Sequence, residues 1–185
     1  MTKKLLIGLG VLCALAFGVL YGNGLLRVHE GLTRPASLAV LAPQTPAKLA
    51  PEVAFSDAAG GRHALADYKG RYVLLNMWAT WCGPCVAELP ALARLKLAVP
   101  GLKVLAVDVG RDKPEAADAF LKSHGAAALG TLVDTEITLS RQFGANVYPT
   151  TVLIDPQGKV VARAEGPATW DAADAIDYFK RLAGS

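Results

Sequence analysis

Two cysteines separated by two residues stand in the stretch WATWCGPCVAELP, which runs from Trp78 to Pro90. Thiols at this spacing can exchange electrons as a reversible disulfide, share a metal ion, or simply close a loop. If a helix begins at the pair, Cys82 and Cys85 lie one turn apart, and their Cα atoms fall within the roughly 4.4–6.8 Å that a disulfide accepts. The disulfide can then open and close without movement of the backbone.

The expected start of the helix gives the two cysteines different roles. Cys82 lies at the positive end of the helix dipole, where unpaired amide donors stabilise a thiolate and can lower a cysteine pKa from about 8.5 to between about 3.5 and 7.5. Cys82 is therefore the expected attacking thiol, and Cys85 the covered partner that resolves a mixed disulfide. Of the intervening Gly83 and Pro84, the proline suits a first helical turn, whose N–H groups are not used.

The metal and structural alternatives have less support. Structural zinc takes four ligands, and after the apolar N-terminal run the only further cysteine or histidine side chains are His29, His63 and His124, which are far apart in the sequence. A disulfide that closes a single helical turn constrains little chain entropy and adds little stability. We therefore predict redox chemistry, with no metal and no cofactor other than the disulfide itself.

Short buried runs alternate with helical patterns along the chain. The candidate strands are RYVLLNMWA, LKVLAVDVG, TTVLID and KVVARAEG, and the candidate helices are residues 83–99, PEAADAFLKSHG, EITLSRQFG and TWDAADAIDYFKRLAG. Residues 53–65 predict a short hairpin around the glycine-containing turn SDAAGG. This order indicates an α/β fold, a three-layer sandwich with a mixed sheet flanked by helices.

The N-terminal segment from Leu5 to Leu26 carries no charge over 22 residues. As a helix it would extend about 33 Å, enough to span a bilayer core of about 30 Å. Lys3 and Lys4 precede it, which predicts that residues 1–4 remain in the cytoplasm and that the rest of the chain is exported. A cleaved signal peptide is the alternative, but the apolar run continues well beyond a small-residue cleavage site.

The remaining chain divides into a linker and one domain. Residues 27–50 carry three prolines and no sustained periodicity, which predicts a flexible linker. Residues 51–185 are the predicted globular domain. Apolar residues make up 52% of the chain and the formal net charge is only +3, which gives no support to nucleic-acid binding. The exported domain would lie outside the cytoplasm, where thiols tend to be oxidised, so Cys82 and Cys85 could form a disulfide there.

Two motifs together resemble a known family. WCGPC after a buried strand and Tyr148-Pro149-Thr150 before TTVLID resemble the thioredoxin superfamily. NMWATWCGPCVAELPAL and YPTTVLIDPQGKVV are more narrowly similar to the TlpA/ResA-like membrane-anchored thiol:disulfide oxidoreductases, over roughly residues 51–183. The resemblance implies a thioredoxin fold with an N-terminal β-hairpin extension.

The same resemblance implies roles for individual residues. Pro149 is expected in the cis form beside the disulfide, so that the backbone of Tyr148 can orient an incoming peptide. Trp81 is expected to offer partners an exposed apolar surface. Thioredoxin has an aspartate where this chain has Asn76, which cannot accept the proton of Cys85. The family instead places a glutamate at the position of Glu88, which is either a partly desolvated proton acceptor or a solvated helix charge.

The resemblance finally implies a biological setting. A membrane-tethered reductase of this type would act on protein disulfides of apocytochrome c or of copper-site proteins in cytochrome oxidase assembly, and would need a membrane electron donor. It would lie in the bacterial inner membrane as a single-pass protein with its domain in the periplasm. Thioredoxin shares the Gly-Pro insert and has a potential of about −270 mV, against about −180 mV for protein disulfide isomerase, which favours a reductase. A disulfide-forming oxidase and a Cu(I)-binding chaperone are the alternatives.

Overall fold

The computed structural model describes residues 33–184, whose core is an eight-stranded mixed sheet with strand order β1-β8-β7-β4-β5-β6-β2-β3. The strands are β1 Ala42–Leu49, β2 Ala54–Asp57, β3 Arg62–Ala64, β4 Val73–Trp78, β5 Lys103–Asp108, β6 Leu132–Val133, β7 Thr150–Ile154 and β8 Lys159–Glu165. Strands β4, β5 and β6 run parallel to one another, and all other neighbours are antiparallel.

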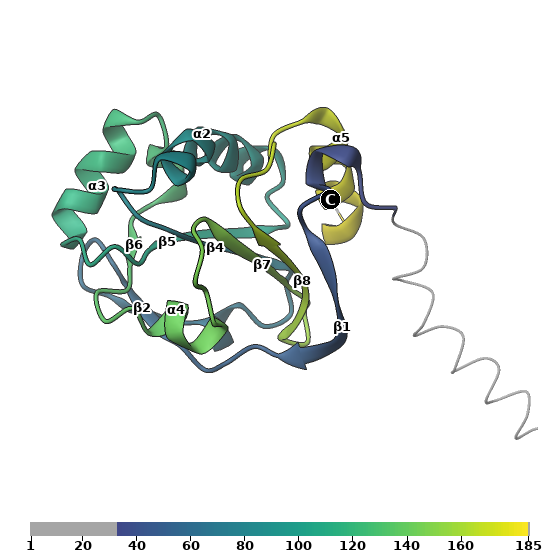
Figure 1. Ribbon diagram of the computed structural model, residues 1–185, viewed down its shortest axis with the longest axis horizontal. Helices are drawn as coiled ribbons and strands as arrows, with labels where there is room; N and C mark the ends of the chain where they lie inside the picture. Colours follow the sequence, from purple (N-terminus) through teal and green to yellow (C-terminus); the bar gives the residue numbers. More distant parts are fainter. Residues whose placement is uncertain (1–32, 185) are drawn as a thin grey trace, which may run out of the picture. The chain divides into compact units, whose positions relative to one another are not determined.

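Helices cover both faces of this sheet. They are α2 Gly83–Ala98, α3 Pro114–Ser123, α4 Thr138–Phe143 and α5 Ala173–Ala183, with 3₁₀ turns η1 Ala36–Leu38, η2 Leu65–Tyr68 and η3 Ala127–Leu129. Helices α2, α3 and α5 lie on one face and α4 lies on the other (Figure 1). The predicted three-layer α/β sandwich with a mixed sheet is confirmed, and so is the hairpin, whose strands β2 and β3 pair antiparallel.

Alternation along the central strand decides which residues face α2. In β4 the side chains of Val73, Leu75 and Met77 enter the core on the α4 face, whereas Leu74 and Trp78 enter the core beneath α2. Because side chains of a strand alternate between faces, Asn76 also points toward α2. A polar side chain is thereby buried between two apolar ones, directly under the helix that begins at the cysteines.

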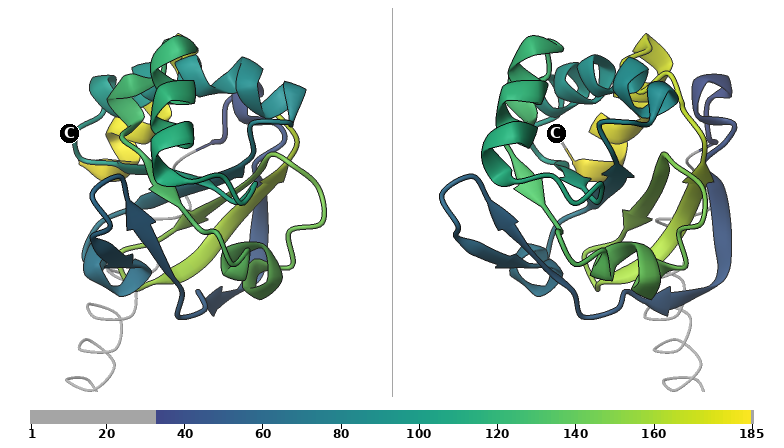
Figure 2. Two further views of the ribbon diagram at one scale, coloured as in Figure 1. Left: turned by 90° about the vertical axis from the view of Figure 1, so that its left-hand side faces the viewer. Right: turned by 60° about the vertical axis from the view of Figure 1, so that its left-hand side comes forward.

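The first strand corrects the sequence-based domain boundary. Residues 27–50 were expected to be a flexible linker, but η1 and β1 lie within them, and β1 pairs antiparallel with β8. Leu38 and Leu41 are fully buried in the core that also contains α5. The compact unit therefore begins at Arg34 and not at residue 51. Figure 2 shows β1 at one edge of the sheet and the β2–β3 hairpin at the other.

The physical reason for this error is the position of β1 at an edge. Proline is tolerated on edge strands, which need only one row of backbone pairs. Pro46 lies where the β1–β8 register is irregular, and nearly every side chain of β1 is exposed. Such a strand shows no apolar alternation in its sequence.

The predicted membrane span, residues 5–26, lies outside the described residues. Within residues 33–184, no helix is both long enough and apolar enough to cross a bilayer.

Candidate active site

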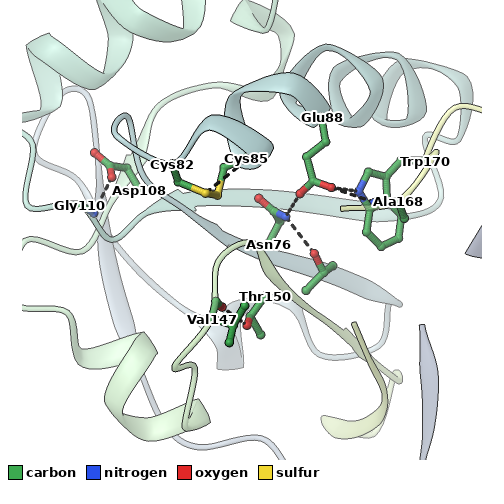
Figure 3. Close-up of a disulfide and its surroundings, with 11 residues drawn as sticks. Asn76, Cys82, Cys85, Glu88, Asp108, Gly110, Val147, Thr150, Ala168 and Trp170 are labelled. Atoms are coloured by element: carbon green, nitrogen blue, oxygen red, sulfur yellow. Dashed lines mark hydrogen bonds between the residues drawn. A yellow bond between two sulfur atoms is a disulfide. The ribbon is translucent and has the colours of Figure 1, made fainter. Parts of the chain in front are cut away.

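The two cysteines lie at the start of α2 and form a disulfide (Figure 3). Cys82 is the N-cap residue of the helix, and the Cα atoms of Cys82 and Cys85 are 5.3 Å apart. The backbone N–H of Cys85 donates a hydrogen bond of 3.3 Å to Sγ of Cys82. Pro84 occupies the first turn, as predicted. The sulfur of Cys82 therefore takes the capping position that an oxygen usually fills, and it faces amide donors that favour a thiolate.

Burial separates the two sulfurs in the expected order. Cys82 is 6% exposed and Cys85 is completely buried. Gly83 and Pro84 are exposed on the surface between them, and a Cβ built on Gly83 would meet no atom within 4 Å. An incoming protein can therefore approach Cys82 over Gly83 and Pro84, whereas Cys85 is accessible only to its partner sulfur.

An apolar rim borders the disulfide. Trp81 is 66% exposed, as predicted, and its ring packs edge-to-face on Tyr148 with 5.8 Å between the ring centroids. The hydroxyl of Tyr148 donates a hydrogen bond of 2.6 Å to Oγ of Ser140 in α4. Helix α4 thus fixes the tyrosine ring, which in turn supports the exposed tryptophan.

The peptide bond between Tyr148 and Pro149 is cis, as the resemblance implies. Among the described residues, the backbone N–H and C=O of Tyr148 make no hydrogen bond with other backbone groups. The carbonyl groups on both sides of Tyr148 do accept hydrogen bonds. The hydroxyl of Thr150 donates to the carbonyl of Val147 at 2.6 Å. The N–H of Gly166 donates to the carbonyl of Pro149 at 2.8 Å. The backbone of Tyr148 is therefore available for pairing with an extended peptide.

Glu88 lies one turn beyond Cys85 in α2 and is only 4% exposed. Three N–H groups donate to its carboxylate: Nδ2 of Asn76 to Oε1 at 2.7 Å, and both Nε1 of Trp170 at 2.7 Å and the backbone N–H of Ala168 at 3.2 Å to Oε2. The alternative of a solvated helix charge is therefore wrong. Loss of solvation on burial raises the pKa of Glu88 to about 7, although the three donors act in the opposite direction.

The partners of Glu88 come from distant parts of the chain. Trp170 is fully buried and belongs to the loop before α5, and Arg94 of α2 holds this loop through a 2.6 Å ion pair with Asp171. Asn76 is fully buried in β4 and also donates to Oγ1 of Thr151 in β7 at 2.9 Å. The sequence analysis excluded Asn76 as a proton acceptor but gave no sign that it holds Glu88. The contribution of Trp170 was not predicted at all.

A second buried carboxylate lies on the other side of the disulfide, where β5 ends (Figure 3). Asp108 is 1% exposed, and its Oδ1 accepts a 2.6 Å hydrogen bond from the N–H of Gly110. Its Oδ2 is buried and has no hydrogen-bond partner within residues 33–184. Loss of solvation raises the pKa of Asp108, and the neighbouring carboxylate of Asp112 raises it further. The sequence analysis did not identify this residue, because VDVG reads as the end of an ordinary buried strand.

The loop after Asp108 packs against the turn that leads into Cys82. The N–H of Val109 donates to the carbonyl of Trp78 at 2.9 Å, and the hydroxyl of Thr80 donates to Oδ2 of Asp112 at 2.7 Å. A Cβ on Gly110 would lie 2.9 Å from Oδ1 of Asp108 and 3.1 Å from Cβ of Ala79. Only glycine allows this close approach. The loop from Asp108 to Asp112 is therefore packed directly against the turn that leads into Cys82.

Comparison with known proteins agrees with this arrangement. A profile of the AhpC/TSA family matches residues 46–163. The thiol-disulfide oxidoreductase ResA of Bacillus subtilis is 38% identical over 122 residues, which cover 65% of this chain and 67% of ResA. ResA of Bacillus thuringiensis subsp. konkukian is 31% identical over 137 residues, which cover 73% of this chain and 77% of that protein.

Solved structures give the same result. A putative thiol:disulfide interchange protein DsbE from Chlorobium tepidum superposes with a TM-score of 0.65 at 28% identity, covering 75% of this chain and 97% of that one. The pneumococcal exposed lipoprotein thioredoxin Etrx1 of Streptococcus pneumoniae superposes with a TM-score of 0.59 at 30% identity, covering 73% and 100% of the two chains. The chain therefore belongs to the AhpC/TSA family and, within the thioredoxin fold, to the ResA-like thiol-disulfide oxidoreductases.

Proposed function

We propose that this enzyme is a membrane-tethered, extracytoplasmic thiol:disulfide reductase in which Cys82 is the nucleophile, Cys85 the resolving thiol and Glu88 the proton acceptor for Cys85. One observation carries the assignment of roles: Cys82 caps a helix N-terminus and keeps 6% exposure, whereas Cys85 is completely buried and a buried carboxylate follows it by one helical turn. No cofactor other than the disulfide is needed for this chemistry.

The proposed cycle begins with both cysteines reduced. The Cys82 thiolate attacks one sulfur of a target disulfide, the target S–S bond breaks, and the released target sulfur takes up a proton. Cys85 then gives its proton to Glu88 and attacks Sγ of Cys82. The bond between Cys82 and the target breaks, and the second target sulfur leaves and is protonated. Two electrons have passed from the enzyme to the target, and a membrane electron donor restores the dithiol.

The surroundings of Glu88 suit a group that accepts and releases a proton. Its pKa of about 7 means that near neutral pH both the ionised and the protonated forms are populated. A pocket is lined by Glu88, other residues of α2 and the 167–171 loop, and Figure 3 shows Ala168 of this loop on the side of the carboxylate away from the disulfide. Protons taken from Cys85 can leave to solvent by this route, without passing the bound target.

Protein disulfides are the substrates, and the rim is arranged to bind them. Trp81 supplies an exposed apolar surface, and Tyr148, whose ring packs on Trp81, offers backbone groups that pair with no other backbone group among the described residues. Gly83 and Pro84 leave the approach to Cys82 open. We propose that the substrates are cysteine pairs of apocytochrome c or of copper-site proteins in cytochrome oxidase assembly, as the resemblance to TlpA/ResA-like proteins implies.

A redox titration tests the direction of electron flow. The full chain is equilibrated with glutathione buffers, and the reduced fraction is measured by thiol alkylation. A potential near the value of about −270 mV known for thioredoxin supports a reductase, whereas a value near about −120 mV, that of DsbA, would establish the oxidase instead.

A separate pair of measurements tests the copper alternative. A Cu(I) chaperone would retain one equivalent of Cu(I), would lose it in Cys85→Ser, and would not reduce insulin. The proposed reductase reduces insulin with a dithiol as electron source, and Cys85→Ser abolishes this activity while accumulating mixed disulfides with target proteins. Identification of the trapped proteins by mass spectrometry then tests the cytochrome c and copper-site assignments.

The membrane tether is the second part of the proposal. The uncharged segment 5–26 and the lysines before it support a single span of the bacterial inner membrane with the domain in the periplasm. The related Etrx1 is described as an exposed lipoprotein. Since η1 begins at Ala36, residues 27–35 would reach at most about 30 Å from the bilayer, which holds the domain near a membrane electron donor.

Topology is tested in intact spheroplasts. Protease added from outside should degrade the domain, and alkaline carbonate should leave the full chain in the membrane pellet. Protection from the protease would contradict the periplasmic assignment, and release by carbonate would show that the segment 5–26 is not a retained anchor.

A further inference from the structure

Asn76 has one amide atom that the oxidised protein leaves without a partner. Its Nδ2 donates to both Glu88 and Thr151, but its Oδ1 is buried and accepts no hydrogen bond from any group within residues 33–184. The residue is 0% exposed, so bulk water does not satisfy the oxygen. A buried carbonyl oxygen without a donor is unfavourable, and such atoms are rare in folded proteins.

The direction of this oxygen suggests which donor it lacks. Figure 3 shows Oδ1 of Asn76 on the side of the amide that faces the disulfide, and Nδ2 on the side that faces Glu88. When Glu88 is ionised, chemistry fixes the orientation of the amide, because a carboxylate accepts hydrogen bonds and requires the NH₂ group beside it. A disulfide sulfur has no hydrogen to donate, whereas a thiol has one. Reduction therefore creates a donor where the oxidised protein has none.

We propose that Asn76 is a redox-linked positioning residue: on reduction, the Cys85 thiol donates a hydrogen bond to Oδ1 of Asn76, while Nδ2 of Asn76 continues to hold Glu88. One side chain then holds both ends of the proton transfer, the thiol that loses the proton and the carboxylate that accepts it. The inference rests on the proposed function in taking Cys85 as the resolving thiol and Glu88 as the acceptor of its proton.

The proposal has a consequence for the redox equilibrium. In the oxidised form the acceptor is unsatisfied, and in the reduced form it is satisfied, so Asn76 favours the dithiol. Replacement by leucine removes the unsatisfied acceptor from the oxidised form. The equilibrium of Asn76→Leu with glutathione should therefore move about tenfold toward the disulfide, a change of about 30 mV to more negative potential.

Thr151→Val is the matched control. It removes the other acceptor of Nδ2 but leaves Oδ1 of Asn76 and the bond to Glu88 in place. Its redox equilibrium should stay within about twofold of that of the wild type, because it alters packing in both redox forms alike. Equal shifts in Asn76→Leu and Thr151→Val would overturn the proposal.

The thiol hydrogen bond itself is measured by infrared spectroscopy. The chain has three cysteines, so Cys85 is the only thiol in the full-length Cys13→Ser, Cys82→Ser protein. We expect its S–H stretching band at lower frequency than that of a free thiol, unchanged by Thr151→Val and raised by Asn76→Leu. A band at the same frequency in all three proteins would overturn the proposal, whatever the potential of the enzyme.

A measurement without any substitution covers the case in which Asn76→Leu does not fold. Wild-type protein labelled with ¹³C at the asparagine side-chain carbonyls is studied as a reduced-minus-oxidised infrared difference spectrum. Formation of a hydrogen bond lowers the stretching frequency of the Asn76 carbonyl on reduction. A difference spectrum with no isotope-sensitive carbonyl band would refute the inference. Failure of the proposed function, such as a potential near about −120 mV, would leave this band in place.

Discussion

Two buried carboxylates lie on opposite sides of the disulfide and are held in different ways (Figure 3). Glu88, toward Cys85, accepts three hydrogen bonds, two of them from Ala168 and Trp170, which are distant in the sequence. Asp108, toward Cys82, accepts one from Gly110, two residues later in the same loop. Burial raises the pKa of both, but only Asp108 has a second acid, Asp112, that raises it further.

The difference concerns the ionised form. When Glu88 loses its proton, three N–H groups already point at the carboxylate and take the place of water. When Asp108 loses its proton, one oxygen has no donor and a like charge lies nearby. The ionised form of Glu88 therefore has its hydrogen-bond donors already in place, whereas the ionised form of Asp108 is less well stabilised. Equal burial therefore does not imply an equal role.

The largest expected effect is that of Glu88→Gln on turnover. Glutamine keeps the size of the side chain but cannot accept the proton of Cys85, so reduction of a protein disulfide at pH 7 should slow by about 100-fold, the lower end of the range for general base catalysis. Stopped-flow fluorescence of mixed-disulfide resolution measures this rate, and the increase of the rate through pH 7 should disappear. An unchanged pH profile would remove Glu88 from the mechanism.

The next effect concerns stability against pH. The pKa of Glu88 rises from 4.5 to about 7 on folding, so the folded state binds more protons than the unfolded state between these values. The contribution of this group to stability is therefore greatest below pH 4.5 and falls by about 3 kcal/mol as the pH rises to 7. Urea unfolding of the oxidised protein between pH 4.5 and 7 should show the combined loss from Glu88 and Asp108 in the wild type, and about half of that combined loss in Glu88→Gln, where only Asp108 remains. Parallel curves for the two proteins would contradict the burial argument.

A smaller effect is expected at the donor from the α5 loop. Trp170→Phe keeps an aromatic ring beside Phe179 but removes a hydrogen bond to the Glu88 carboxylate. The pKa of Glu88 should rise by about one unit, which lowers its ionised fraction and the rate at pH 7 about fivefold and leaves the rate at pH 9 unaffected. The control Phe179→Leu loosens the same core without removing a donor, and its pH midpoint should not move. If both variants shift the midpoint equally, the hydrogen bond is not the cause.

The smallest effect is expected on the Cys82 side. Asp108→Asn keeps an oxygen for the N–H of Gly110 and removes the repulsion from Asp112. Turnover at pH 7 should change by less than about threefold, because Asp108 takes no part in the proposed proton transfer, and the unfolding free energy above pH 7 should increase. A loss of turnover as large as that of Glu88→Gln would show that the two carboxylates act together. It would contradict the expectation that only Glu88 affects turnover strongly.

Much of the fold and the redox site could be predicted from local patterns. The cysteine pair, Pro84 in the first turn and the buried run of β4 are features of neighbouring residues, and the structure places each where it was expected. Helix and strand periods depend on short-range geometry, so α3 and β7 were also correctly located. The motif around Tyr148 and Pro149 correctly indicated a cis peptide bond just before β7.

Other elements could not be predicted because their stability comes from distant partners. Strand β1 is held by pairing with β8 and shows no apolar alternation. Strand β6 has only two residues and is recognisable only by its pairing with β2 and β5. Neither element has a sequence pattern strong enough to mark it, because its hydrogen bonds are made to chain segments that the local sequence does not identify.

The sequence alone determined that the chain carries an electron-exchanging thiol pair at the start of a helix, because the spacing of the cysteines and the geometry of a helical turn are local properties. Only the tertiary structure decided the surroundings of the carboxyl groups near that pair. Burial of Glu88, its contact with Asn76 and Trp170, and the packing of Asp108 beside the Cys82 turn all require segments brought together by folding. The ionisation of a carboxyl group depends on solvation and on donors in space, which no local pattern encodes.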